Sequence, residues 1–263
     1  MLSIERRREI LDLLNKKGSV KVLDLATHYN VGKETIRRDL KALEQEWNIS
    51  IVYGGAYLQS SSTETQIQEE NITTKRKSNL DLKERIAKKA VEFIEPGDII
   101  ALNSGSTVEC MLNYLHEKTP LSIITSNITI ASKASMIDGI DVYIPSGKIR
   151  AKSGMIVGTD AERYIQNFTA QKCFFGVSAI SLGSHITHPA VEEIENNRAL
   201  MSISEKVFLI ADHNKFEKKS LFLLAKLEEM SAIITDEPLL DSYETYCKNF
   251  GIDVHVAISE DEE

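Results

Sequence analysis

The stretch from residue 33 to residue 47 constrains the N-terminal part of this chain more than any other. Its apolar side chains, Ile36, Leu40, Leu43 and Trp47, recur at helical spacing, which predicts an amphipathic helix packed on a small core. The rest of the helix carries Glu34, Thr35, Arg37, Arg38 and Lys41. Two arginines and a threonine in the early turns of a helix are able to contact base edges and phosphates in a DNA major groove. Such a helix alone is more typical of an ordinary solvated surface, so the flanking sequence decides.

The segments on either side of this helix favour a helix-turn-helix. Residues 4–16 predict a first helix that Gly18 ends, and residues 21–29 predict a short second helix. Asn30-Val31-Gly32 makes the turn into the third helix, with Gly32 as an adequate N-cap. Residues 49–53 and 56–58 alternate like two short strands joined near the glycine pair 54–55. We therefore expect a winged helix-turn-helix domain over residues 1–58.

These motifs make residues 1–58 similar to the N-terminal domain of the DeoR family of bacterial transcriptional regulators. The resemblance lies in Arg6, Ile10 and Leu14, in residues 35–40, and in residues 53–56 of the wing. Glycine stands at position 32 where the family has a small hydroxyl residue, and tyrosine stands at position 53 where it has histidine. The resemblance implies a set of residues that contact operator DNA: Arg6, Lys33, Thr35, Arg37, Arg38, Lys41, Tyr53, Gly54 and Gly55.

Charge is divided unevenly along the chain. The whole sequence carries a net charge of −8, whereas residues 1–58 hold ten basic and eight acidic residues, so the remainder carries −10. A weakly basic head on an acidic body suits a protein whose N-terminal part alone contacts DNA. No apolar run approaches the roughly 20 residues that cross a bilayer, and the N-terminus enters a helix without resembling a signal peptide. Cys110, Cys173 and Cys247 lack disulfide or metal spacing, so we expect reduced thiols in a cytoplasmic protein.

A polar segment, residues 59–79, follows the head and predicts a linker. Residues 83–94 resume helical periodicity, so we place a second domain at residues 80–263. Short apolar runs rich in β-branched or aromatic residues occur at 99–102, 121–124, 142–144, 173–175, 207–211, 232–234 and 254–256, with helices expected at 108–115, 160–167, 191–204 and 240–249. Strands that alternate with helices predict an α/β fold with a doubly wound, mostly parallel sheet.

Polar loops follow five of these strands, and parallel sheets bind ligands at the carboxyl ends of their strands. The loop at residues 103–107 offers amides and hydroxyls at the start of a helix, as an anion site does, although it also fits a plain strand-to-helix turn. The candidate ligand residues are Asn103, Ser104, Gly105, Ser106, Thr107, Thr125, Asn127, Lys148, Gly176, Glu192, Asp212 and Lys215. They predict a phosphate held by residues 103–107 and Lys215, with Asn127 and Glu192 on the hydroxyls of a sugar.

The second half also resembles the DeoR family's sensor domain, which is related in fold to ribose-5-phosphate isomerase and binds sugar phosphates. The resemblance rests on residues 103–107, where asparagine replaces the family's aspartate, and on residues 125–127, 175–177, 192–193 and 211–216. An isomerase-like enzyme is the alternative, with Glu192 or Asp212 as base and Lys215 as the cation; an enzyme of that kind would not need a DNA-reading head. His185, His188 and His213 match no usual metal-site spacing, so we expect no metal and no cofactor.

The sequence therefore predicts a cytoplasmic regulator, most simply a repressor of a carbohydrate-utilisation operon. Its partners would be double-stranded operator DNA and a sugar-phosphate effector, with no membrane. A transcriptional activator would have the same features. Because one helix-turn-helix head contacts too few bases for useful specificity, we expect a homodimer or homotetramer.

Overall fold

Residues 3–17, 19–46, 49–52, 54–58, 65–67, 69–181, 183 and 185–258 are described by the computed structural model of the chain. Their contacts divide the chain into two units. The first comprises Met1–Thr63 with Leu239–Gly251, and the second comprises Glu64–Pro238 with Ile252–Glu263. No described helix is long and apolar enough to cross a membrane. The three cysteines are unpaired, as the sequence predicts.

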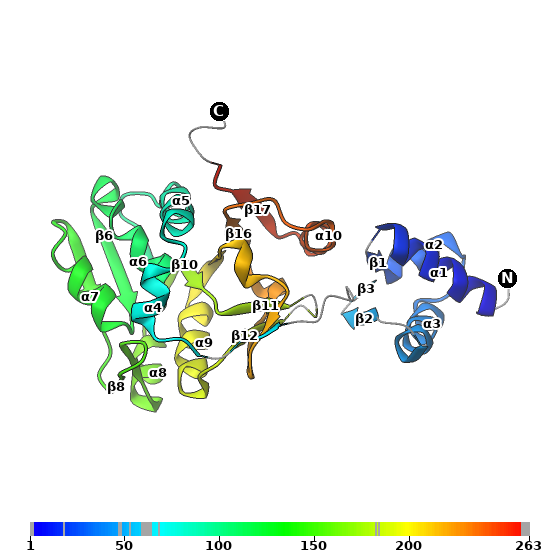
Figure 1. Ribbon diagram of the computed structural model, residues 1–263, viewed down its shortest axis with the longest axis horizontal. Helices are drawn as coiled ribbons and strands as arrows, with labels where there is room; N and C mark the ends of the chain where they lie inside the picture. Colours follow the sequence, from blue (N-terminus) through cyan, green and yellow to red (C-terminus); the bar gives the residue numbers. More distant parts are fainter. Residues whose placement is uncertain are drawn as a thin grey trace. The chain divides into compact units, whose positions relative to one another are not determined.

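The N-terminal part of the first unit contains the predicted helix-turn-helix and wing (Figure 1). Its helices are α1 (Ser3–Lys17), α2 (Val22–His28) and α3 (Lys33–Glu46), and its strands are β1 (Ser19–Lys21), β2 (Ile49–Val52) and β3 (Gly55–Leu58). The strands form an antiparallel sheet in the order β1-β3-β2, in which β1 was not expected from the sequence. Gly18, Trp47 and Tyr53 lie outside the described residues.

The core of this domain forms where the sequence places the apolar stripes. Ile36 and Leu40 of α3 are fully buried with Ile10 and Leu14 of α1, because residues four apart share one face of a helix. Asn30 adopts a φ of 50° in the turn before α3, a left-handed conformation that asparagine tolerates better than most residues. Packing and turn together orient α3 so that its charged arc faces away from the core.

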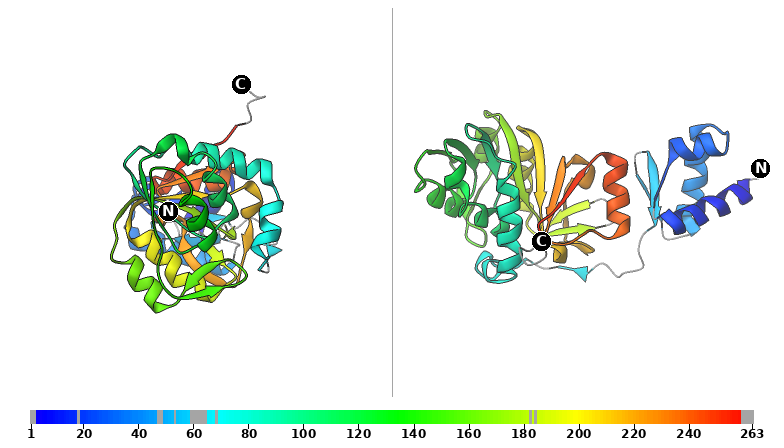
Figure 2. Two further views of the ribbon diagram at one scale, coloured as in Figure 1. Left: turned by 90° about the vertical axis from the view of Figure 1, so that its left-hand side faces the viewer. Right: turned by 90° about the horizontal axis from the view of Figure 1, so that it is seen from above.

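The second unit is built on a seven-stranded parallel sheet in the order β17-β16-β13-β10-β5-β6-β7 (Figures 1 and 2). The strands are β5 (Ile99–Leu102), β6 (Leu121–Thr125), β7 (Ile140–Tyr143), β10 (Ala170–Gly176), β13 (Ser204–Ile210), β16 (Ala232–Thr235) and β17 (Asp253–Val256). They confirm the seven predicted strands and the predicted fold class. The chain runs from β5 toward one edge and from β10 toward the other, so the strand order reverses between these two neighbours.

Helices cover both faces of this sheet. On one face Ile100, Phe174 and Phe208 share a core with α5 (Leu80–Val91), α6 (Ser106–Met111) and α7 (Ile128–Ala134). Ala101 and Leu209 alternate with these side chains and are fully buried on the other face, where α9 (Ile194–Ser202) contacts the sheet and α8 (Thr159–Ile165) contacts α9. Burial on both faces explains why the strands are continuous apolar runs in the sequence.

Several smaller elements of the chain were not expected. They are α4 (Ile72–Lys77), β4 (Thr65–Gln66), β8 (Lys148–Arg150), β9 (Met155–Val157), β11 (Ala179–Ser181), β12 (His185–His188), β14 (Lys218–Lys219), β15 (Phe222–Lys226) and the 3₁₀ turns η1 (Leu115–Lys118), η3 (His213–Lys215) and η4 (Leu227–Glu229). The 3₁₀ turn η2 (Val191–Glu193) begins the helix predicted over residues 191–204. Strands β11, β12 and β15 form a separate antiparallel sheet, and α10 (Asp241–Phe250) is the last helix. Residues 65–79, expected within a linker, lie in the second unit, where β4 pairs with β14.

Candidate DNA-binding surface and ligand pocket

Helix α3 presents a basic surface whose side chains face away from the core of the N-terminal domain. Lys33, Arg37, Arg38 and Lys41 are exposed, and Thr35 is half-buried. The Arg37 guanidinium pairs with Glu34 on the same helix, and both side chains remain largely exposed. Arg38 and Lys41 have no ion pair within the part of the chain that the structure describes. The predicted reading face is therefore present, with free cations in the early turns of the helix.

Arg6 has a different role from the one predicted. Its side chain is only 8% exposed, and its Nε donates to Asp39 Oδ2 at 2.6 Å, while Arg7 Nε reaches Asp39 Oδ1 at 3.1 Å. Asp39 is itself buried, so the two arginines of α1 neutralise a carboxylate of α3 at the interface between the helices. The expectation that Arg6 contacts DNA is wrong for this geometry, since its charge is used inside the domain.

The two glycines of the wing are required at their positions for different structural reasons. Gly54 is exposed with a φ of 100°, where an L side chain would be strained. Gly55 is buried where β3 passes β1, and a Cβ there would lie 2.3 Å from the Val20 carbonyl oxygen. Gly55 therefore serves strand packing, whereas Gly54 is exposed and its predicted contact with DNA stays a prediction. Tyr53 lies outside the described residues.

A pocket in the second unit opens at the carboxyl ends of β5 and β10, where the strand order reverses. Open parallel sheets bind ligands at such a position. The pocket holds about 600 Å³ of empty space, part of it open to solvent. It is lined by residues 104–107 after β5, by residues 176–178 after β10, by residues 69, 70, 72 and 75, and by Lys152, Ser153, His188, Pro189, Glu193 and Lys215. The structure thus brings together six predicted residues: Ser104, Gly105, Ser106, Thr107, Gly176 and Lys215.

Asn103 joins the two strand ends that form the floor of the pocket. Its Nδ2 donates to the Gly176 carbonyl at 2.9 Å, and its Oδ1 accepts from the Gly176 N–H at 2.8 Å. The side chain is buried, so Asn103 holds the site together and does not present a free group to a ligand. Gly105 and Gly176 pack closely, because a Cβ on Gly105 would lie 3.4 Å from the Gly176 Cα.

The second predicted loop, residues 125–127, braces the first. Asn127 Oδ1 caps α7 by accepting from the N–H groups of Thr129 and Ile130, at 2.9 and 3.0 Å. Its Nδ2 donates to Ser104 Oγ at 2.7 Å and to the Ser153 carbonyl at 2.9 Å. Thr125 is fully buried, and its Oγ1 accepts from the Asn127 N–H. Both residues therefore position Ser104, and the direct ligand contacts predicted for them are wrong.

Two lysines approach the loop after β5 from different segments. Lys75 of α4 and Lys215 of η3 both line the pocket, and neither ammonium has a hydrogen bond or ion pair among the described residues. Burial, and then the charge of Lys215, lower the pKa of Lys75. Lys152 also lines the pocket but pairs with Glu69 at 3.4 Å. Lys148, which the sequence proposed, is exposed in β8 and is not part of the lining.

The acidic residues that line the pocket are Glu69, Glu70 and Glu193, whereas the sequence pointed to Glu192. Glu192 is 57% exposed, while Glu193 is buried between Arg150 Nη1 at 3.0 Å and His188 Nε2 at 2.9 Å. Burial raises the pKa of Glu193 against the opposing effects of Ser153 and Arg150. Burial likewise lowers the pKa of His188 to about 4, so this imidazole is neutral at neutral pH. The pair offers an acceptor and a neutral ring to a polar ligand.

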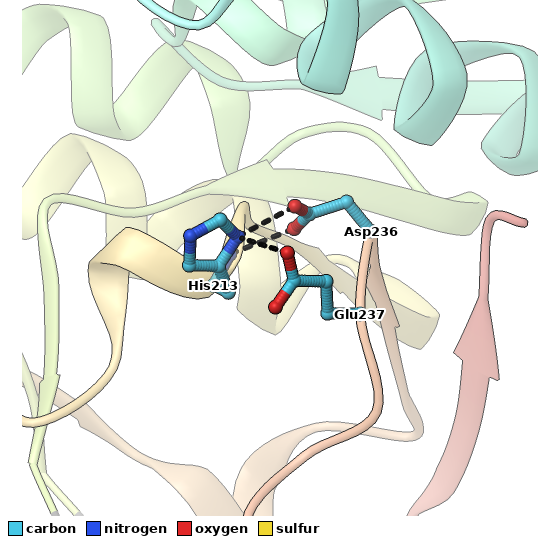
Figure 3. Close-up of side chains that lie close together, drawn as sticks. All are labelled: His213, Asp236 and Glu237. Atoms are coloured by element: carbon cyan, nitrogen blue, oxygen red, sulfur yellow. Dashed lines mark hydrogen bonds and ion pairs between the residues drawn. The ribbon is translucent and has the colours of Figure 1, made fainter. Parts of the chain in front are cut away.

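Asp212 and His213 hold the turn that carries Lys215. Asp212 is fully buried and its Oδ1 caps η3 through the Asn214 N–H at 3.1 Å, while its Oδ2 has no hydrogen-bond partner among the described residues, so the predicted ligand contact of Asp212 stays a prediction. His213 meets Asp236 twice, through Nδ1 at 2.6 Å and through its backbone N–H at 2.7 Å, with Glu237 Oε1 at 3.5 Å (Figure 3). These three side chains have the types and spacing to hold a metal ion. The hydrogen bond to Asp236 raises the pKa of His213, which favours the protonated ring beside the two carboxylates.

Both units match models of one protein family. Residues 6–62 match the DeoR-like helix-turn-helix domain, and residues 78–237 match the DeoR C terminal sensor domain. The chain belongs to the DeoR family. Like other members of this family it is a transcriptional regulator with an N-terminal DNA-binding domain and a C-terminal sensor domain.

Curated members of the DeoR family are similar to this chain over nearly its whole length. The lactose phosphotransferase system repressor of Staphylococcus aureus is 31% identical over 92% of this chain and 96% of its own. The glycerol-3-phosphate regulon repressor of Escherichia coli is 29% identical over 90% of this chain and 92% of its own. The transcriptional regulator IolR of Bacillus subtilis is 29% identical over 97% and 100%. Among solved structures, ribose 5-phosphate isomerase A of Methanocaldococcus jannaschii matches with a TM-score of 0.40 and 17% identity over 53% of this chain and 55% of that one.

Sequence reasoning missed the part of the pocket that comes from outside the strand ends. Glu69 and Lys75 lie in the expected linker, and His188 lies in β12. One signal could have identified the role of Arg6: it precedes Ile10 by four residues, as Ile10 precedes Leu14, and therefore lies on the buried stripe of α1.

Proposed function

We propose that this DeoR-family regulator is a repressor whose operator binding is controlled by a sugar monophosphate in the sensor pocket. The observation that carries the proposal is the meeting of two unpaired lysines with residues 104–107 at the switch point of the parallel sheet. The names of the relatives support the same conclusion, since they describe repressors of a lactose phosphotransferase system and of a glycerol-3-phosphate regulon.

The phosphate would lie between the loop after β5 and the two lysines. The Gly105 carbonyl accepts from the Glu109 N–H at 2.9 Å, so the amides of Ser106 and Thr107 precede the regular hydrogen bonds of α6. Together with the Ser106 and Thr107 hydroxyls they offer donors to phosphate oxygens. Lys75 and Lys215 would balance the two negative charges, and each would gain the acceptor that it lacks.

The sugar would extend toward Ser153, His188 and Glu193. These side chains provide donors and acceptors, which suits a ligand rich in hydroxyl groups. Arg150 keeps Glu193 in place with a 3.0 Å contact, so the acceptor is fixed before the ligand arrives. Glu193 therefore takes the role that the sequence gave to Glu192.

Control of transcription would take place in the cytoplasm with a homodimer or homotetramer on paired half-sites, because a single head reads too few base pairs. The exposed arc of α3 would read the major groove through Arg37, Arg38 and Thr35, with Lys33 and Lys41 on phosphates. Repression, as opposed to activation, is inferred from the relatives, whose names are those of repressors.

An isomerase-like activity is the alternative. The carboxylate base of such an enzyme would now be Glu193, which is held by Arg150 and His188. A transcriptional regulator does not need isomerase activity. We propose that the pocket binds its ligand without turnover. Incubation with ribose 5-phosphate followed by product analysis tests this point, and formation of ribulose 5-phosphate would contradict it.

Calorimetry of the purified full chain tests the binding proposal. The panel would contain glucose 6-phosphate, fructose 1-phosphate, ribose 5-phosphate and glycerol 3-phosphate, each beside its unphosphorylated parent. We expect at least one phosphate ester to bind and to stabilise the fold, with about 2.7 kcal/mol at a ligand concentration of roughly 100 Kd. The parent compounds should not bind. Equal binding of a parent compound, or binding of no ester, would contradict the proposal.

A further inference from the structure

The chain reaches the sensor sheet through residues 69–78, here called the strap, which lie across the ligand pocket. Glu69 accepts two hydrogen bonds from the Arg150 guanidinium, one of them from Nη2 at 2.7 Å. The Ile72 N–H donates to the Lys152 carbonyl at 3.1 Å, and Arg76 Nε donates to Glu109 Oε2 at 2.8 Å. Lys83 of α5 donates from its buried ammonium to the carbonyls of Lys75 and Ser78. The strap is therefore attached to the sensor unit at both ends.

These attachments are polar, and apolar burial adds little to them. No residue of α4 is buried, and the half-buried Ile72 is the only large apolar side chain of the strap. The Arg150–Glu69 pair is 15% and 17% exposed and the Arg76–Glu109 pair is 34% and 9% exposed, so water competes only in part for these charges. The docked position of the strap therefore depends on charged groups, and a change in the charges beneath it is able to alter how firmly it is held.

One side chain of the strap works against docking. Lys75 places its ammonium in the pocket beside that of Lys215, without an acceptor among the described residues. An ammonium that loses water without gaining a hydrogen bond disfavours the docked strap, and the charge of Lys215 adds repulsion. The carboxylates of Glu193, Glu70 and Glu69 offset these penalties only in part, because the pKa of Lys75 is still lowered. An anion between the two lysines would remove both penalties at once.

We propose that Lys75 is a direct ligand of the effector phosphate and that effector binding and docking of the strap are coupled through it. The inference rests on the proposed function, since it assumes that a phosphate ester occupies this pocket. Coupling of this kind is reciprocal: the anion favours the docked strap, and a docked strap raises affinity for the anion.

Hydrogen exchange of the full chain, with the panel of phosphate esters named above, tests the coupling. A binding ester should slow exchange of the amides in residues 72–78. Lys75→Met should weaken its affinity on the order of tenfold to a hundredfold, because a hydrogen-bonded charge is lost. In the absence of ester, the same variant should exchange more slowly in the strap than the wild type, since the unpaired ammonium is gone. Lys77→Met is the matched control, because Lys77 is exposed on the same helix and does not line the pocket.

A second variant tests the coupling from outside the pocket. Arg76 and Glu109 do not line the pocket, and Glu109 keeps Lys133 as a partner at 2.7 Å when Arg76 is replaced. Arg76→Gln should raise exchange in the ester-free strap and lower affinity about twofold to fivefold, the effect of losing one partly exposed ion pair. Coupling requires this loss of affinity, whereas a strap that is only a fixed wall predicts none.

The outcomes separate this inference from the function on which it rests. If an ester binds but leaves strap exchange unchanged, and Lys75→Met binds it as tightly as Lys77→Met does, the coupling is wrong and the proposed function stands. If Arg76→Gln loosens the strap at unchanged affinity, coupling is likewise wrong. If no ester binds the wild-type chain, the proposed function and this inference both fail.

Discussion

Two arginines of the DNA-binding domain should give opposite results when they are replaced. Arg38 is exposed on α3 without an ion pair among the described residues, whereas Arg6 is buried against Asp39. Arg38→Ala should leave unfolding within about 0.5 kcal/mol of the wild type, as for most surface changes. If Arg38 contacts a guanine through both of its terminal nitrogens, the variant should lose about 1–3 kcal/mol of operator binding. That loss is roughly 5-fold to 150-fold in Kd.

The main effect of Arg6→Met should be a loss of stability of the folded protein. Removing one partner of a buried ion pair costs about 3–5 kcal/mol when the remaining charge is left alone. Asp39 keeps Arg7 at 3.1 Å, so we expect a smaller loss, about 2–3 kcal/mol in the free energy of unfolding. Urea denaturation followed by the fluorescence of Trp47, the only tryptophan in the chain, measures this loss.

Fluorescence anisotropy with a DNA fragment from the regulator's own promoter region measures operator binding. Titration at two salt concentrations, against a scrambled fragment, separates base contacts from phosphate contacts. A base contact changes the ratio between the two fragments, while a phosphate contact weakens both equally and reduces the salt dependence. Full operator affinity for Arg38→Ala, together with lost affinity and unchanged stability for Arg6→Met, would refute the placing of Arg38 on the DNA-binding face and of Arg6 in the buried helix interface.

Further predictions concern the sensor unit. Ser106→Asp, alone or combined with Thr107→Glu, should abolish calorimetric binding of the phosphate ester. Because Thr107 is buried and Ser106 is half-buried, the single variant is expected to keep the fold, and retained affinity would place the phosphate elsewhere. Asn103→Ala should destabilise the unit by about 1–3 kcal/mol in urea, because the Gly176 N–H and carbonyl both lose their partner; wild-type stability would contradict the bridging role. His213 has a raised pKa, so its pairing with Asp236 should stabilise the fold fully below pH 6.5 and progressively less as pH rises through the folded pKa. Asp236→Asn should remove this pH dependence, and an NMR titration of His213 with a pKa at or below 6.5 would contradict it.

Much of the fold could be predicted because packing between distant segments requires a recognisable pattern of apolar residues within each segment. Strands such as β13 are buried on both faces and therefore form continuous apolar runs, and the helices of the N-terminal domain carry regular stripes. Strand β12 of the separate antiparallel sheet has no such pattern in its sequence. The sequence of β12 is His-Ile-Thr-His, and its partner β15 lies more than 30 residues further on. Short polar strands of this kind are fixed by pairing that no local pattern encodes.

The candidate site was half predictable for a similar reason. The rule for strand ends finds residues 104–107 and Gly176 because it depends on topology, which the sequence indicates. It does not distinguish a group that faces the pocket from one that braces it, and Asn103 and Asn127 both turned out to brace. Glu192 and Glu193 are neighbours in the short turn η2, and which of the two side chains points into the pocket depends on how that turn is oriented, which the sequence does not indicate. Lys75 was missed because a strap held by ion pairs has the composition of a linker.

Release from operator DNA by a sugar phosphate is the most direct test of the account. The full chain would be bound to its labelled promoter fragment and titrated with the phosphate ester that binds by calorimetry, beside the Ser106→Asp, Thr107→Glu variant. We expect the ester to change the affinity of the wild type for this DNA and to leave that of the variant unchanged, while both proteins bind DNA equally without ester. An ester that binds the pocket without changing operator affinity, or that acts equally on the variant, would contradict control through this site.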